Sequence, residues 1–74
     1  SVIPMKLSNK TLYRLCNEYQ WFTGGDCRQY EKLFERNKRG ASLETLAIII
    51  WLCSSGYEEK DILEILQKEC ENDG

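Results

Sequence analysis

Histidine is absent from the 74 residues, and proline occurs only once. The lack of histidine removes the commonest general base and the commonest metal ligand. The longest unbroken apolar run covers residues 47–53, far short of the ~20 residues that a membrane-spanning helix needs. We therefore expect neither histidine-based catalysis nor a membrane partner.

The four cysteines contain no CxxC pair, because they stand at positions 16, 27, 53 and 70. Structural zinc sites usually take their ligands in close pairs, so we predict no metal ion. An even count also permits a disulfide framework, but no secretory signal is recognisable. We favour buried thiols in a reducing cytoplasm for Cys16, Cys27 and Cys53, which lie in apolar sequence. Cys70 fits this interpretation less well.

Groups that could carry out catalysis are scarce. No nucleophile stands beside a base, and the adjacent Glu58 and Glu59 are better interpreted as first-turn charges of a helix. We predict that the protein is not an enzyme and binds no cofactor.

Charge is unevenly distributed along the chain. The net charge is −2, which argues against general nucleic-acid binding. Residues 28–39 nevertheless hold five basic and two acidic residues, whereas residues 57–74 hold seven acidic and two basic ones. The chain is thus basic in its middle and acidic at its end.

Helix caps and helix breakers divide the chain into four stretches. In chain order these signals are Ser8, Gly24, Gly25, Asp26, Gly40, Ser42 and Gly56. Serine and aspartate cap helix N-termini, whereas glycine commonly ends helices. Apolar residues recur at helical spacing between them, and so short a chain holds one core. We predict a single all-α domain over residues 1–74, a compact bundle of four short helices. Residues 1–7 are expected to be extended or added before the natural start, and residues 70–74 to be a frayed tail.

The third predicted helix, residues 42–54, is the most apolar. One face carries Leu43, Leu46 and Ile50, yet Ile48 and Leu52 project from nearly the opposite side. A helix that is apolar all round is buried on all sides, so we expect a central helix wrapped by the other three. Alternatively, Ile48 and Leu52 face a partner or a second copy. The substitution Ile48→Asp should be damaging in either case.

An aromatic pair, Trp21 and Phe22, precedes the glycines at positions 24 and 25. The glycines lack the lysine or hydroxyl of a phosphate loop, and Asp26 would repel a phosphate, so we expect a corner between two helices. Trp21 and Phe22 either pack into the core beneath this corner or form an exposed contact for a partner.

A basic stripe runs along the second predicted helix. Its members Arg28, Lys32, Arg36 and Arg39 fall within about 80° of one another on a helical wheel. The stripe is either a solvated outer face, flanked by Glu31 and Glu35, or a binding surface. As a binding surface it would contact phosphates or an acidic protein.

Most of residues 7–66 resembles small uncharacterised helical proteins carried by mobile elements and phages of Gram-positive bacteria. The similar positions are Leu12, Tyr13, Leu15, Asn17, Trp21, Phe22, Gly40, Leu46, Ile50, Trp51 and Gly56. The resemblance implies a bacterial cytoplasm and an accessory role, and no functional residue follows from it.

Together these features predict a cytoplasmic adaptor or regulator that acts by binding a protein, with self-association as a further option. The predicted contact residues are Trp21, Phe22 and the basic stripe, with Ile48 and Leu52 as an apolar interface. The alternative is a small DNA-binding regulatory protein. It would contact DNA through the basic stripe and not through the last helix, because the exposed face of that helix carries Asp61 and Glu64, which DNA would repel.

Overall fold

The computed structural model describes residues 6–22, 27–54 and 56–73, and its regular elements are all helices. These are α1 (Asn9–Tyr19), α2 (Cys27–Lys38), α3 (Leu43–Cys53) and α4 (Glu59–Asp73). The predicted all-α class and the four short helices are therefore confirmed.

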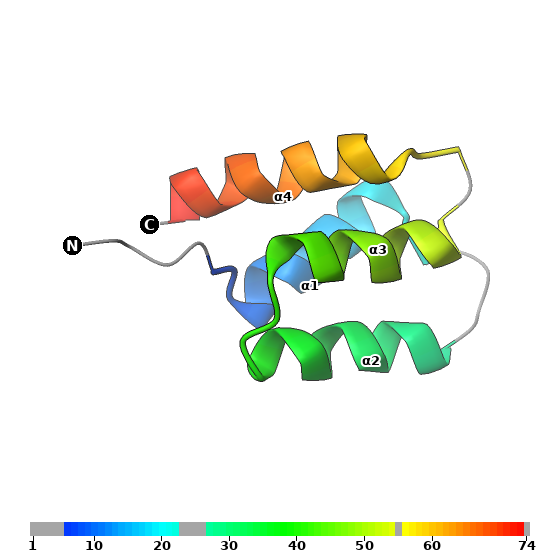
Figure 1. The fold of residues 1–74 in the computed structure, drawn as a ribbon, viewed down its shortest axis with the longest axis horizontal. Coiled ribbons are helices and arrows are strands. Elements are labelled where there is room, and N and C mark those ends of the chain that lie inside the picture. Colours follow the sequence, from blue (N-terminus) through cyan, green and yellow to red (C-terminus); the bar gives the residue numbers. More distant parts are fainter. Residues whose placement is uncertain (1–5, 23–26, 55, 74) are drawn as a thin grey trace.

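The third helix lies between two neighbours. Figure 1 shows α3 between α2 and α4, with α1 behind it. α3 packs against both α2 and α4, and α1 packs against α2. Short connections join α2 to α3 and α3 to α4, so that consecutive helices run in opposite directions (Figure 1).

Local side-chain chemistry sets the starts of α1 and α3. The Ser8 Oγ accepts a hydrogen bond from the Thr11 backbone amide at 3.1 Å, and the Ser42 Oγ accepts one from the Thr45 amide at 3.3 Å. Each bond satisfies an amide that lacks a partner within the helix. Both predicted serine caps are confirmed, whereas Asp26 lies outside the described residues.

The helix ends follow backbone conformation. Gly40 follows α2 with φ of 91°, in the left-handed region that glycine adopts without steric cost. α1 ends earlier than the glycines at positions 24 and 25 predict, because Gln20 takes a left-handed conformation with φ of 54°. The Trp21 amide then donates to the Cys16 carbonyl at 3.2 Å, and the chain turns into the core. α3 runs from Leu43 to Cys53 between caps at Ser42 and Ser54, in agreement with the predicted helix over residues 42–54, and Gly56 lies just beyond.

One hydrophobic core joins all four helices. The side chains buried completely are Leu12, Leu15, Trp21, Leu33, Leu46, Ile50, Ile62 and Leu66. Their spacing within each helix is the three- and four-residue repeat expected of an inward stripe. The core residues therefore follow from helical periodicity, except for Trp21, which lies after the end of α1.

Both ends of the described chain belong to the fold. Leu7 is buried, and its carbonyl accepts a hydrogen bond of 2.9 Å from Asn37 Nδ2 on α2. Cys70 is also buried, and α4 continues to Asp73. Cys70 lies four residues after Leu66, so it continues the inward stripe of α4. Residues 1–5 and 74 lie outside the described part of the chain, so the expectations for residues 1–7 and 70–74 stay predictions.

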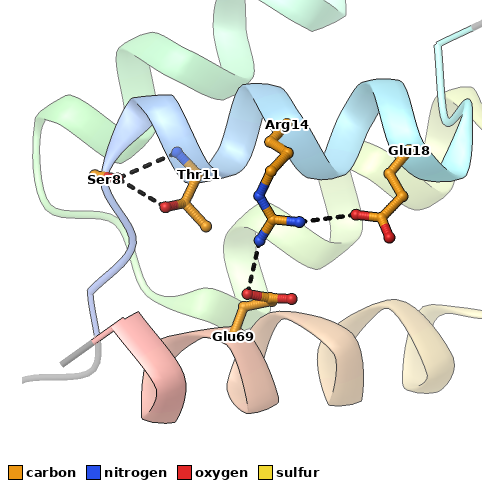
Figure 2. Close-up of polar contacts among 5 residues, drawn as sticks. All are labelled: Ser8, Thr11, Arg14, Glu18 and Glu69. Carbon is orange, nitrogen blue, oxygen red and sulfur yellow. Dashed lines mark hydrogen bonds and ion pairs between the residues drawn. The ribbon is translucent and has the colours of Figure 1, made fainter.

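A polar bridge connects α1 to α4 at the surface. Figure 2 shows Arg14 between two carboxylates, with Nη1 2.8 Å from Glu18 and Nη2 2.9 Å from Glu69. Exposed ion pairs of this kind typically contribute less than about 1 kcal/mol, so the bridge orients α1 against α4 more than it stabilises the fold.

Candidate partner-binding surface

The surface of α3 that points away from the core is apolar. Ile48, Trp51 and Leu52 are 43%, 45% and 64% exposed, and we call these three residues the outer face of α3. They are three and four residues apart, so they form one patch. The expected wrapping of α3 on all sides is therefore not confirmed. Two helices flank α3 and one lies behind it, which leaves its front uncovered among the described residues (Figure 1).

A shallow groove of about 240 Å³ separates the outer face from α2. Its lining comprises Gln29, Lys32 and Arg36 from α2, and Thr45, Ile48, Ile49 and Leu52 from α3. One wall is therefore basic and the other is mostly apolar. Shallow surfaces of this mixed character suit a protein segment better than a small molecule, which needs an enclosed pocket.

The basic stripe divides into residues that border the groove and residues that do not. Lys32 and Arg36 are exposed and line it. Arg39 lies just beyond α2 and forms an ion pair of 2.9 Å with Glu35. Arg28 is exposed near the start of α2 but is absent from the groove lining. Two of the four predicted cations are thus placed beside the outer face of α3.

The aromatic corner belongs to the core. Trp21 is fully buried, stacks on Tyr19 with ring centroids 5.2 Å apart, and meets Tyr57 edge-on at 6.3 Å. A partner cannot reach this side chain while the chain is folded, so the prediction of Trp21 as an exposed anchor is replaced by its role in the core. Phe22 is half-buried and packs edge-on against Tyr30 at 5.2 Å.

The exposed tryptophan is Trp51, which the sequence interpretation did not select as a contact residue. The sequence feature that could have indicated Trp51 is its position three residues after Ile48, on the same side of the helix. Tryptophan is enriched among the residues that dominate binding energy at protein interfaces. Trp51 therefore takes the place among the candidate contacts that Trp21 held.

Two of the cysteines are buried. Cys16 and Cys70 lie in the core, Cys53 is half-buried, and the Cys27 side chain lies outside the described part. Burial raises the pKa of the Cys16 thiol from its ordinary value of 9.0 to about 12. A thiol held in its neutral form is a poor nucleophile, so Cys16 acts as a small apolar core residue.

The raised pKa of Cys16 predicts a loss of stability in alkali. Between pH 9 and 12 the unfolded chain releases the thiol proton while the folded chain retains it. The free energy of unfolding should therefore fall by about 1.4 kcal/mol per pH unit in this window through Cys16 alone. Urea denaturation at pH 8 and pH 10 should show a smaller loss for Cys16→Ala than for the wild type. Equal losses in the two proteins would contradict the assignment.

Two further depressions lie on the surface of the described residues. One is lined by Tyr19, Asp61, Glu64, Ile65, Lys68 and Glu69, and another by polar residues of α1 and its cap. In the described part of the chain, no three cysteine or carboxylate side chains gather where they could hold a metal ion. Within the same residues, no helix has the length and apolar character to cross a membrane.

The chain was compared with protein-family models, with curated proteins and with solved structures. None of the three comparisons gives a match.

Proposed function

We propose that this chain is a non-enzymatic protein-binding adaptor or regulator, an accessory protein of a bacterial mobile element that acts in the cytoplasm. In this proposal its partner binds the outer face of α3. The partner-binding residues are Ile48, Trp51 and Leu52, with Lys32 and Arg36 at the border. Phe22 and the remaining members of the basic stripe are not required.

The observation that carries the proposal is the outer face itself. The buried side of α3, with Leu46, Ala47 and Ile50, already supplies the core. The exposed side chains of Trp51 and Leu52 are therefore not needed to hold the helix in place. Contiguous exposed apolar side chains on a small domain are typical of interaction surfaces, because binding removes them from water.

A DNA-binding regulatory protein is the alternative, and the basic stripe is its support. Arg39 is already paired with Glu35, and the outer face of α3 offers apolar groups where phosphates need cations. A protein partner uses both the apolar face and the two cations, whereas DNA would use only the cations. The surface therefore favours the protein partner.

Affinity capture with matched baits tests the proposal. We expect the wild-type chain to retain a protein from a Gram-positive bacterial lysate in the presence of nuclease. The double variant Trp51→Ala, Leu52→Ala should retain at least ten-fold less, because hot-spot aromatic and aliphatic contacts are lost. Tyr13→Ala is the control, because Tyr13 is 53% exposed but lies on α1. Circular dichroism checks that each bait is folded.

Two results would overturn the proposal. Retention of the same protein by the wild type and by the double variant would place the contact elsewhere. Retention of nucleic acid that is lost on charge reversal of Lys32 and Arg36 would support the DNA-binding alternative instead.

A further inference from the structure

We infer that the groove between α2 and α3 binds an acidic amphipathic helix of a partner protein. The apolar side of that helix lies on the outer face of α3, and its carboxylates face Lys32 and Arg36. This inference rests on the proposed function and specifies the chemistry of the partner at the same surface.

The geometry of the groove suits a helix. Lys32 and Arg36 are four residues apart on α2, and Ile48 and Leu52 are four residues apart on α3. Residues four apart lie one turn apart on the same side of a helix, so each pair forms a row along its helix. α2 and α3 lie side by side and antiparallel (Figure 1), so the two rows lie along opposite walls of the groove. The groove from Thr45 to Leu52 covers about 10 Å, or two helical turns.

The charge of the groove selects acidic ligands. Among the described residues that line it, Lys32 and Arg36 are positive and none is acidic. Neither cation forms an ion pair with another described residue, and the neighbouring Glu35 is engaged by Arg39 at 2.9 Å. The positive wall is therefore not neutralised by a lining carboxylate, and a ligand that brings carboxylates would be attracted and oriented by it.

The apolar wall excludes a ligand that is only acidic. Ile48, Ile49 and Leu52 give no hydrogen bonds to a phosphate or a carboxylate through their side chains. Ile49 is already buried, and the exposed Ile48 and Leu52 are covered favourably only by apolar side chains at the spacing of one helix face, which is how amphipathic helices bind grooves. Trp51, on the other flank of Ile48, would pack against the far side of the bound helix and shield it from water.

A second copy of this chain is not the best ligand for the groove. Its own acidic helix is α4, whose inward stripe Ile62, Leu66 and Cys70 is buried in the core. The side of α4 that remains exposed presents Asp61 and Glu64, which bring carboxylates without large apolar anchors. A separate helix that carries both features satisfies both walls of the groove.

Selection from a peptide library tests the inference without knowledge of the natural partner. The probe is a display library of 16-residue helical peptides with randomised positions on one face and along both edges. The baits are the wild-type chain and the Lys32→Glu, Arg36→Glu double variant. We expect peptides selected by the wild type to combine apolar residues at helical spacing with Asp or Glu along one edge. The variant should select the same apolar positions with Lys or Arg along that edge.

Binding of the selected acidic peptide should then weaken in a defined pattern. We expect at least a ten-fold higher Kd for Trp51→Ala and for the charge-reversed variant, and less than a two-fold change for Tyr13→Ala. The inference is overturned if neither bait enriches any peptide, or if both baits enrich the same charge. It is also overturned if the chain forms a dimer that Trp51→Ala dissociates, because a second copy would then occupy the surface.

The two proposals fail separately. If the outer-face variant loses the captured lysate protein but the library yields no acidic helix, the adaptor function stands and the partner chemistry is rejected. If the captured protein is retained by the outer-face variant, the adaptor proposal falls whatever the library yields.

Discussion

Trp21→Ala is expected to unfold most of the chain at 25 °C. The Trp21 side chain is fully buried and stacks on Tyr19, and Tyr57 meets it edge-on. Truncation of a buried tryptophan typically costs 3–5 kcal/mol, through lost burial and the cavity left behind. A domain of this size has a thin stability margin, so a loss of about 4 kcal/mol leaves little folded protein. Urea denaturation followed by far-UV circular dichroism measures the effect.

Trp51→Ala is the matched control, because it removes the same kind of side chain from an exposed position. Trp51 is on the outer face of α3, and its loss should change the free energy of unfolding by no more than about 1 kcal/mol. If Trp51→Ala destabilises the chain as much as Trp21→Ala does, the assignment of one tryptophan to the core and the other to the surface is wrong.

Ile50→Asp is expected to prevent folding, whereas Ile48→Asp should leave the fold intact and abolish partner binding. Ile50 is completely buried, so a carboxylate there would be desolvated without a partner. Ile48 points outward beside the groove, where a carboxylate remains hydrated. The two positions are two residues apart on α3, so helix propensity is nearly the same in both variants.

Circular dichroism and size-exclusion chromatography distinguish these variants. A folded Ile48→Asp that no longer binds the selected acidic peptide agrees with the account, and Ile48→Asn controls for the added charge. An unfolded Ile48→Asp, with Ile48→Asn folded poorly as well, would show that this side of α3 is part of the core after all.

The local signals in the sequence were sufficient to predict the helices. A serine cap acts on an amide three residues later, and an inward stripe such as Ile62 and Leu66 repeats within one helix. Such interactions depend on neighbours along the chain, so they can be read from spacing alone. The end of α1 was less predictable, because Gln20 adopts a left-handed conformation that is usually taken by glycine. This conformation turns the chain so that Trp21 enters the core.

The candidate site depended on information that spacing does not contain. Periodicity placed Ile48 and Leu52 opposite the core side of α3, but whether another helix covers them is decided by the packing of distant segments. A helix that is apolar all round favours complete burial, yet four short helices leave one of its sides open. The two tryptophans show the same limit. Trp21 follows the end of α1, where helical periodicity no longer applies, and only the folded arrangement buries it.

The central claim is that the partner binds the outer face of α3. The most direct test measures the solvent accessibility of Trp51 before and after the partner binds. Each tryptophan gives one indole N–H signal in a proton–nitrogen-15 NMR spectrum. The signal that disappears in the Trp51→Phe variant belongs to Trp51, and the remaining one belongs to Trp21. A soluble paramagnetic agent should broaden the Trp51 signal of the free chain and spare that of Trp21. Addition of the captured partner should protect Trp51 from broadening. A Trp51 signal that stays equally broadened in the complex would show that the partner binds elsewhere, and would contradict the account.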